Sequence, residues 1–296
     1  MIARDSLIFR LRPADLLNLS FLSLLLAIAA IFHQRIDGAA MLMVLYSTLI
    51  CFQTLLILIK DKNVLSRWAY DLIFPTVSII LVFDSLGRLV HSLNPTDIDH
   101  LLMRLDYMLF LGNPTVMMEK IASPLLTDVL QLAYTSYYFL PISLGIVLKV
   151  KKDDSAFDRS VFLIMLCFYL SYIGYLLMPA LGPRFTLTHL HDNELRGFLI
   201  AQPIQELLNR LEGIKRDAFP SGHTAVALTV LYLASRFERR LFRLFLPLVC
   251  ALIFSTVYLR YHYVVDVVAG VLLALITIVI GEKYYGYREK RVGLTS

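Results

Sequence analysis

The sequence predicts an all-α fold, a polytopic membrane helical bundle with about eight transmembrane helices. Hydrophobic residues make up 58% of the 296-residue chain and charged residues only 17%, whereas a soluble domain is typically about half apolar and about a quarter charged. The mean hydropathy is +0.68. Apolar windows recur along the chain, and about 20 apolar residues are enough for one helix to cross a bilayer. These observations exclude an ordinary soluble protein.

The apolar windows give the expected spans in chain order: Ala14–Phe32, Gly38–Ile59, Trp68–Val90, Leu125–Leu148, Ser160–Leu181, Ser221–Ser235, Leu241–Leu259 and Tyr263–Ile280. The sixth span is short. The segment Met1–Pro13 is basic and has no small-residue cleavage site, so we expect the first span to stay as an anchor. We interpret the cysteines inside the spans as small buried hydrophobic residues: Cys51, Cys167 and Cys250.

Lys and Arg are concentrated in alternate connections between the spans. The rich connections contain Arg4, Arg10, Arg12; Lys60, Lys62, Arg67; Lys149, Lys151, Lys152, Arg159; Arg236, Arg239, Arg240, Arg243; and Lys283, Arg288, Lys290, Arg291. This asymmetry predicts cytoplasmic termini, with the connections Thr96–Ser123 and Arg184–Pro220 on the extracytoplasmic face of a bacterial inner membrane. The net charge of +5 follows from this topology, and we predict no nucleic-acid partner.

The connection Thr96–Ser123 is amphipathic and is broken at Gly112-Asn113-Pro114. This segment would suit a helix in the membrane interface or a flap beside a lipid entrance. The alternative interpretation is a plain surface connector.

The stretch "DAFPSGHTAVAL", Asp217–Leu228, places polar groups at the start of a predicted membrane helix. The N-terminus of a helix carries unpaired amides and the positive end of the helix dipole, which attract anions. Gly222 would let a phosphate approach the backbone, and His223 would project from the first turn. Because a lone histidine at a membrane surface is more often a plain interfacial side chain, the catalytic interpretation depends on partner residues.

Partner residues occur in two other stretches that are predicted to lie on the same face. In "YLRYHYVVDVVAG", His262 and Asp266 are spaced so that they share a face of a helix. A carboxylate that binds one imidazole nitrogen leaves the other free to attack, and Arg260 supplies a fork suited to phosphate oxygens. In "MPALGPRF", Arg184 follows the fifth span. Ionisable groups at a membrane edge are functional by default, so we predict one site.

The Pro-Ser-Gly-His stretch and the His-x3-Asp stretch together resemble the second and third signatures of the type 2 phosphatidic acid phosphatase superfamily, the lipid phosphate phosphatases. The resemblance covers Trp68–Ile280. It implies a six-helix phosphatase-like core, no cofactor, no metal and a phosphohistidine mechanism. By this resemblance His262 is the nucleophile, Asp266 its orienting acid and His223 the acid for the leaving oxygen. Arg184 and Arg260, with the Ser221-Gly222 turn, would bind the phosphate.

The chain departs from the family pattern at several positions. Leu177 stands where the first signature has a lysine, and we predict that Lys215 or Arg216 replaces that charge as a phosphate-binding group. Ser255-Thr256 occupies the usual Ser-Arg position, and the predicted helical register keeps Arg260 on the same face. The arrangement "RYHYVVD" is similar to the inositolphosphotransferase and inositol phosphorylceramide synthase branch.

The resulting domain prediction has an added helix pair at 1–67, a catalytic core at 68–282 with the interfacial segment 96–123 and the outer loop 184–220, and a cytoplasmic basic tail at 283–296. The predicted function is cleavage of a lipid-linked phosphate ester, with water or an alcohol or lipid hydroxyl as acceptor. The predicted partners are a membrane lipid phosphate or phospholipid substrate and the bilayer. The alternative is a transporter or a membrane scaffold, although no inverted repeat or midplane site is evident.

Other ionisable and aromatic residues have simpler interpretations. We expect Asp84 and Arg88 to pair with each other, the tract His189–Glu194 to be solvated loop, and Tyr137 and Tyr138 to pack or form an aromatic belt. Asp217 could cap the helix entry or bind a neighbouring arginine.

Overall fold

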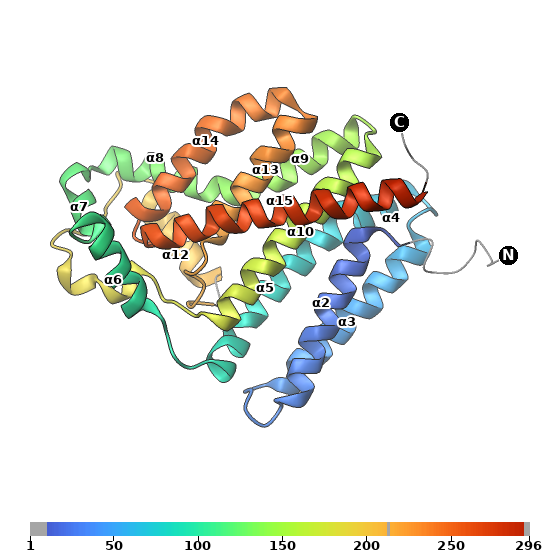
Figure 1. The fold of residues 1–296 in the computed structure, drawn as a ribbon, viewed down its shortest axis with the longest axis horizontal. Coiled ribbons are helices and arrows are strands. Elements are labelled where there is room, and N and C mark those ends of the chain that lie inside the picture. Colours follow the sequence, from blue (N-terminus) through green and yellow to red (C-terminus); the bar gives the residue numbers. More distant parts are fainter. Residues whose placement is uncertain (1–10, 212–213, 293–296) are drawn as a thin grey trace.

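The computed structural model describes residues 11–211 and 214–292, and every regular element in these ranges is helical. This confirms the predicted all-α bundle (Figure 1). The longer helices are α2 (Pro13–Ile31), α3 (Ala39–Ile59), α5 (Phe74–Leu93), α6 (Asp99–Phe110), α8 (Pro124–Thr135), α9 (Phe139–Val150), α10 (Asp154–Leu177), α12 (Ala201–Leu211), α13 (Gly222–Phe237), α14 (Arg239–Tyr258) and α15 (Val264–Val292). The short ones are α4 (Val64–Trp68), α7 (Pro114–Met117), α11 (Pro183–Thr186), the π-helix η1 (Ala69–Ile73) and the 3₁₀ helices η2 (Met118–Ile121), η3 (Ser136–Tyr138) and η4 (Thr188–Leu190).

In the described residues, 6 helices are long and apolar enough to cross a membrane. They are α2, α3, the composite helix Val64–Leu93, α10, α14 and Val264–Arg288 of α15. The composite helix passes through η1, where Phe74 N–H bonds to Ala69 O in the π pattern. Pro75 follows directly and has no N–H to continue the α pattern.

Two predicted spans do not form a single helix of membrane-spanning length. The fourth, Leu125–Leu148, is divided into α8 and α9 by η3. Pro141, in the first turn of α9, cannot donate to the carbonyl of Tyr137, so the α pattern is interrupted there. The sixth is α13, which has only 16 residues. Both are shorter than a helix needs to span a bilayer unaided, so their crossing of the membrane stays a prediction.

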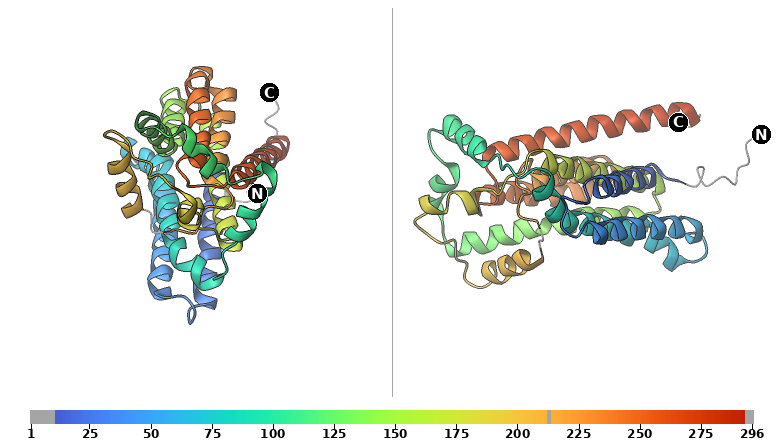
Figure 2. Two further views of the ribbon diagram at one scale, coloured as in Figure 1. Left: turned by 90° about the vertical axis from the view of Figure 1, so that its left-hand side faces the viewer. Right: turned by 90° about the horizontal axis from the view of Figure 1, so that it is seen from below.

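Helix α10 is the central helix of the bundle. Of the membrane-length windows it has the largest buried share, 61%, and it packs against α2, α5, α9, α13 and α15. The hairpin of α2 and α3 lies at one side of the bundle, as the two further views show (Figure 2). The hydrophobic core runs from this hairpin through α10 to α13 and α14.

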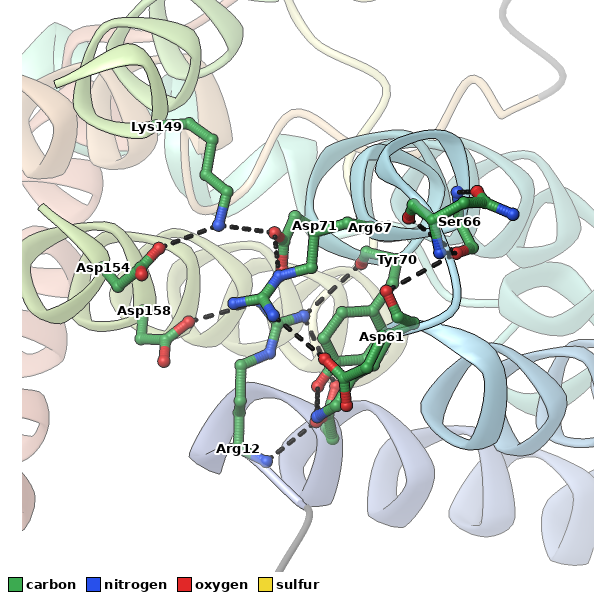
Figure 3. Close-up of polar contacts among 12 residues, drawn as sticks. Arg12, Asp61, Ser66, Arg67, Tyr70, Asp71, Lys149, Asp154 and Asp158 are labelled. Atoms are coloured by element: carbon green, nitrogen blue, oxygen red, sulfur yellow. Dashed lines mark hydrogen bonds and ion pairs between the residues drawn. The ribbon is translucent and has the colours of Figure 1, made fainter. Parts of the chain in front are cut away.

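At the end of the bundle where α10 begins, predicted basic residues are joined to buried acids (Figure 3). Asp71 of η1 accepts from Arg12, Arg67 and Lys149 at 2.8, 3.1 and 2.6 Å, and its side chain is 2% exposed. Arg159 and Arg236 pair with Glu282 nearby. The basic connections that the described residues include therefore meet at one end of the bundle, and the predicted catalytic motifs lie at the other.

Parts of two predictions lie outside the described residues. Arg4 and Arg10 belong to the undescribed start, and residues 293–296 belong to the predicted basic tail. The described part of that tail, from Lys283 to Val292, continues helix α15.

Candidate active site

Three separate loops meet at the opposite end of the bundle. They are the loop after α10, the loop before α13 and the link between α14 and α15. Backbone bonds join them: Arg184 N–H donates to Arg260 O at 2.8 Å, Ala218 N–H to Ala180 O at 3.1 Å, and Ser221 N–H to Asp266 O at 3.1 Å. Gly182 has a φ of +87°, and a Cβ there would lie 2.4 Å from the carbonyl oxygen of Tyr261. Only glycine fits this crossing.

His262 lies in the α14–α15 link, before the first residue of α15. The prediction that it shares a helical face with Asp266 was therefore wrong in detail, although the two side chains are near each other. The Nδ1 atom lies 2.8 Å from the carbonyl oxygen of Ala218 and 3.5 Å from Oδ2 of Asp266. Because a carbonyl oxygen only accepts, Nδ1 carries the proton and Nε2 keeps its lone pair.

The environment of His262 keeps its imidazole neutral. Burial lowers the pKa of His262 to about 4, and the positive charge of Arg184 acts in the same direction. The charge of Asp217 and the hydrogen bond to Ala218 oppose this shift. A neutral imidazole near pH 7 means that the contact with Asp266 is not an ion pair.

His223 faces His262 from the first turn of α13. Its Nδ1 lies 3.5 Å from Nε2 of His262, while its own Nε2 is buried without a hydrogen-bond partner among the described residues. The ring lies between two tyrosines, with centroid distances of 4.5 Å to Tyr134 and 4.2 Å to Tyr137. The aromatic packing expected for Tyr137 is present, and its partner is a predicted catalytic residue.

A small pocket of about 10 Å³ opens at the two histidines. Its wall contains the predicted phosphate-binding Arg184, whose guanidinium carbon lies 4.7 Å from the ring centroid of Tyr261. The remaining wall residues include three that the sequence did not single out as site residues: Tyr134, Leu181 and Tyr261. Asp217 also lines the pocket, together with His223 and His262.

Arg260 is directed elsewhere. Its guanidinium donates to Oε1 of Glu119 at 2.6 Å and to the carbonyl oxygen of Asn193 at 2.7 Å, and it is not among the residues lining the pocket. The predicted helical register fails because α14 ends at Tyr258 and Arg260 has a φ of +65°. The structure therefore does not bring Arg260 to the two histidines, and its phosphate-binding role stays a prediction.

The other predicted phosphate-binding residues have local partners. Ser221 caps α13, accepting from Thr224 N–H at 3.3 Å. At Gly222 a Cβ would lie 2.2 Å from the hydroxyl oxygen of Tyr175, so this glycine permits close packing. Arg216 binds Asp97 at 2.6 Å, and Lys215 is exposed. Neither Lys215 nor Arg216 lines the pocket.

Carboxylates in the segment 96–135 hold the loops that carry the predicted catalytic residues, and sequence reasoning missed this. Asp99 accepts from the N–H groups of Leu181 and Gly182, both at 2.8 Å. Asp106 accepts from Val264 and Val265 at 2.9 Å and caps α15. In the sequence, the signal for Asp99 and Asp106 was that each is an acidic residue among apolar ones in an amphipathic segment.

The same segment also fastens the outer loop. Asp128 of α8 accepts from the N–H groups of residues 198 to 201, at 2.8 to 3.1 Å, and so caps α12. Glu119 accepts from the N–H groups of Asp192 and Asn193. His191 in the tract His189–Glu194 contacts the hydroxyl of Thr115 at 3.3 Å, so this tract is partly fastened rather than fully solvated.

Two further expectations can be compared with the structure. Among the described residues, no group of three or more His, Cys, Asp or Glu side chains is arranged to hold a metal ion. Asp84 and Arg88 are both exposed, and the described structure contains no ion pair between them. Arg88 instead lies against the α2–α3 connection, where a Cβ on Gly38 would be 2.7 Å from its guanidinium.

Comparisons with known proteins identify the family of the chain. The family model described as the PAP2 superfamily matches residues 100–280, more than half of the chain. The chain is also similar to a PA-phosphatase related-family protein of Dictyostelium discoideum, with 24% identity over 188 residues. These residues cover 56% of this chain and only 34% of that relative. No solved structure matches. The family match begins within α6, so a core that starts at Trp68 stays a prediction. The match includes the paired histidines and the three loops at the site, and the chain belongs to the PAP2 superfamily.

Proposed function

We propose that this protein cleaves a lipid-linked phosphate ester through a phosphohistidine at Nε2 of His262. The observation that supports this most directly is the hydrogen bond from Nδ1 of His262 to Ala218 O at 2.8 Å. It leaves the lone pair on Nε2, the atom that faces His223. Membership of the PAP2 superfamily supports a phosphatase-type activity.

The reaction divides the work between the two histidines. Nε2 of His262 attacks phosphorus, and the new P–N bond forms as the P–O bond to the leaving alcohol breaks. Protonated His223 gives its Nδ1 proton to the leaving oxygen. The acceptor hydroxyl then attacks phosphorus, passes its proton to His223, and breaks the P–N bond. Arg184 stabilises the charge on the equatorial oxygens throughout.

The acceptor decides the reaction class. With water the protein is a phosphatase, and with a head-group or lipid alcohol it is a phosphotransferase. The "RYHYVVD" arrangement around Arg260 favours testing inositol first among the alcohols. The relative from Dictyostelium carries a phosphatase name, which supports testing phosphatidic acid first among the lipid phosphates.

The proposed location is a bacterial inner membrane with the site on the extracytoplasmic face. The basic residues that meet around Asp71 and Glu282 would then lie in the cytoplasm, as the positive-inside rule requires. A cysteine at position 192 in a background without the native cysteines tests this. A membrane-impermeant reagent should label it in intact cells, and labelling only after permeabilisation would reverse the topology.

Trapping of the intermediate tests the mechanism. Purified protein should be incubated in EDTA with ³²P-labelled phosphatidic acid, with and without inositol, and quenched within one turnover. We expect radiolabelled protein whose label is stable to base and lost in acid, as a phosphoramidate requires, and no label in His262→Ala. Product analysis then separates phosphate from phosphoinositol. Label retained in His262→Ala, or activity abolished by EDTA and restored by magnesium, would contradict the proposal.

A further inference from the structure

Helix α6 presents three different faces along its length. The face toward the protein carries buried residues, with Asp99 and Asp106 separated by Leu102. A second face is apolar and exposed, made of Leu101, Leu105, Met108 and Leu109, with exposed fractions of 43%, 39%, 64% and 66%. A third face is exposed and carries His100, Arg104 and Tyr107. At about 100° per residue, each of these sets forms one continuous stripe.

This arrangement is the reverse of that in a helix on a water-soluble surface. There the acids would face the solvent and the leucines the core. In α6 the acids face inward because each accepts two backbone N–H groups: Asp106 from Val264 and Val265, and Asp99 from Leu181 and Gly182. The apolar stripe is left outside, where contact with water would be unfavourable.

The exposed apolar surface continues beyond the helix at both sides. At the C-terminal end it continues into Phe110 and Leu111, the latter 88% exposed. On its flank α6 contacts α15, a helix of membrane-spanning length whose Val268 and Leu272 are exposed by 52% and 55%. Figure 2 shows α6 beside the start of α15. The stripe on α6 is thus continuous with a surface that the bilayer covers.

We propose that the stripe Leu101–Leu105–Met108–Leu109 is embedded in the acyl chains of the leaflet that borders the active site. With its 12 residues α6 is too short to cross the bilayer, so it lies along the interface. The adjoining face, His100–Arg104–Tyr107, lies at the level of the head groups, where a basic side chain and a tyrosine are favoured. The surface binds lipid independently of any reaction at the histidines.

This placement couples the bilayer to the catalytic loops. Asp106 holds the first turn of α15, which begins two residues after His262, and Asp99 holds Gly182, two residues before Arg184. Asp99 also accepts from the hydroxyl of Tyr263 at 3.1 Å. We therefore assign Asp99 and Asp106 as positioning residues that act through His262 and Arg184.

Depth-resolved fluorescence tests the membrane contact. Arg104→Cys and Met108→Cys, each in a background with Cys51, Cys167 and Cys250 replaced, are labelled with an environment-sensitive dye and reconstituted into phosphatidylcholine–phosphatidylglycerol vesicles. Nitroxides on the acyl chains should quench the dye at 108 more strongly than the dye at 104. Nitroxides on the head groups should show the opposite order. The matched pair lies on one helix, and the readout does not require catalytic activity.

Two fluorescence results would overturn the proposal. Quenching of the dye at 108 by aqueous iodide as strong as that of a dye at the exposed position 192 would place the stripe in water. A dye at 108 shielded from iodide and from both lipid quenchers would mean that another protein copy covers it.

Kinetics test the positioning role. Asp106→Ala leaves the Val264 and Val265 N–H groups without their acceptor, so we expect kcat of the folded fraction to fall about tenfold or more with KM little changed. Asp106→Asn keeps one acceptor oxygen and should recover part of this loss. A lower melting temperature with unchanged kcat in both variants would remove the positioning role, while the fluorescence result would stand on its own.

Discussion

The Nδ1 atom of His262 lies 2.8 Å from the carbonyl oxygen of Ala218, and this backbone bond orients the imidazole. Ala218 belongs to the loop that leads into α13, so the loop that precedes His223 also sets the ring of His262. Asp266 is farther away, with Oδ2 at 3.5 Å from Nδ1, and the same oxygen accepts from Tyr263 N–H at 2.8 Å. The carboxylate of Asp266 thus orders the start of α15 as well as contacting the imidazole of His262.

This geometry predicts a modest effect for Asp266→Asn. The amide oxygen can still accept from Tyr263, and Ala218 still holds the Nδ1 proton. The expected loss of kcat is therefore well below the roughly 10⁴-fold seen where a carboxylate alone holds the tautomer. Asp266→Ala, which orphans the Tyr263 N–H, should lose more. Single-turnover rates measure both, and equal losses near 10⁴-fold would mean that the carboxylate governs the tautomer after all.

The two histidines should respond differently to the leaving group. His262→Ala removes the nucleophile, so phosphoryl transfer should vanish with every ester. His223→Ala should lower the rate on a lipid phosphate by about 10²–10⁴-fold, the usual contribution of a general acid. It should recover much of this on nitrophenyl phosphate, whose leaving group departs as an anion. Rates on the two esters give the comparison, and equal losses for both variants would remove this division of roles.

Arg184 and Arg260 should also differ. Arg184→Ala should lower kcat/KM by about 10²–10³-fold, as for the loss of one transition-state donor. If Arg260 binds phosphate, Glu119 competes with phosphate for it, and Glu119→Gln should then lower KM by roughly threefold to tenfold, a coupling of about 1 kcal/mol.

The gain in Glu119→Gln should disappear when Arg260→Ala is added. Arg196→Ala breaks an exposed pair with Glu194 and serves as the control that should leave the kinetics unchanged. The alternative result is that Glu119→Gln and Arg260→Ala lower activity equally and that the double variant loses no more than either single variant. The ion pair would then serve only to hold the two segments together, and Arg260 would not bind phosphate.

Acid should destabilise the fold through His262. Burial lowers the pKa of His262 to about 4, from an ordinary value of 6.5. Between these values the unfolded chain binds a proton that the folded protein does not, so the free energy of unfolding decreases as the pH is lowered through this window. The contribution is fully present above pH 6.5 and is lost progressively toward pH 4. Melting temperatures of wild type and His262→Gln should converge as the pH falls. A constant difference between them, like that for the exposed His189→Gln, would refute the burial effect.

The acid–base cluster in Figure 3 should be a major source of stability. Asp71→Ala leaves Arg12, Arg67 and Lys149 without a shared buried partner, and the loss of one member of a buried pair costs about 3–5 kcal/mol. Asp61 is 66% exposed and pairs with Arg67, so Asp61→Ala should cost at most about 1 kcal/mol. Thermal unfolding in one detergent compares the two, and similar losses would show that the cluster is no more than a surface network.

The sequence was informative wherever one local pattern decided the structure. Helix α10 was predicted because a long apolar window has few alternatives in a membrane. The break at η3 and the π-helix η1 were missed because the apolar windows alone do not show where Pro141 and Pro75, which lack an N–H, interrupt the α pattern. The two histidines were singled out because their motifs are rare, and the structure brings them together. The wall residues Tyr134 and Leu181 were missed because, in sequence, each looks like any other membrane residue.

By itself the sequence determined the helical class and the family, and it predicted a shared site for the two histidines, since hydropathy and short motifs are local properties of the chain. The tertiary structure alone decided which groups those histidines meet. The bond from His262 to Ala218, the capture of Arg260 by Glu119 and the loop contacts of Asp99 and Asp106 join residues far apart in the chain. A buried carboxylate or imidazole must find a partner when it leaves water, and which partner it finds is set by the packing of the bundle.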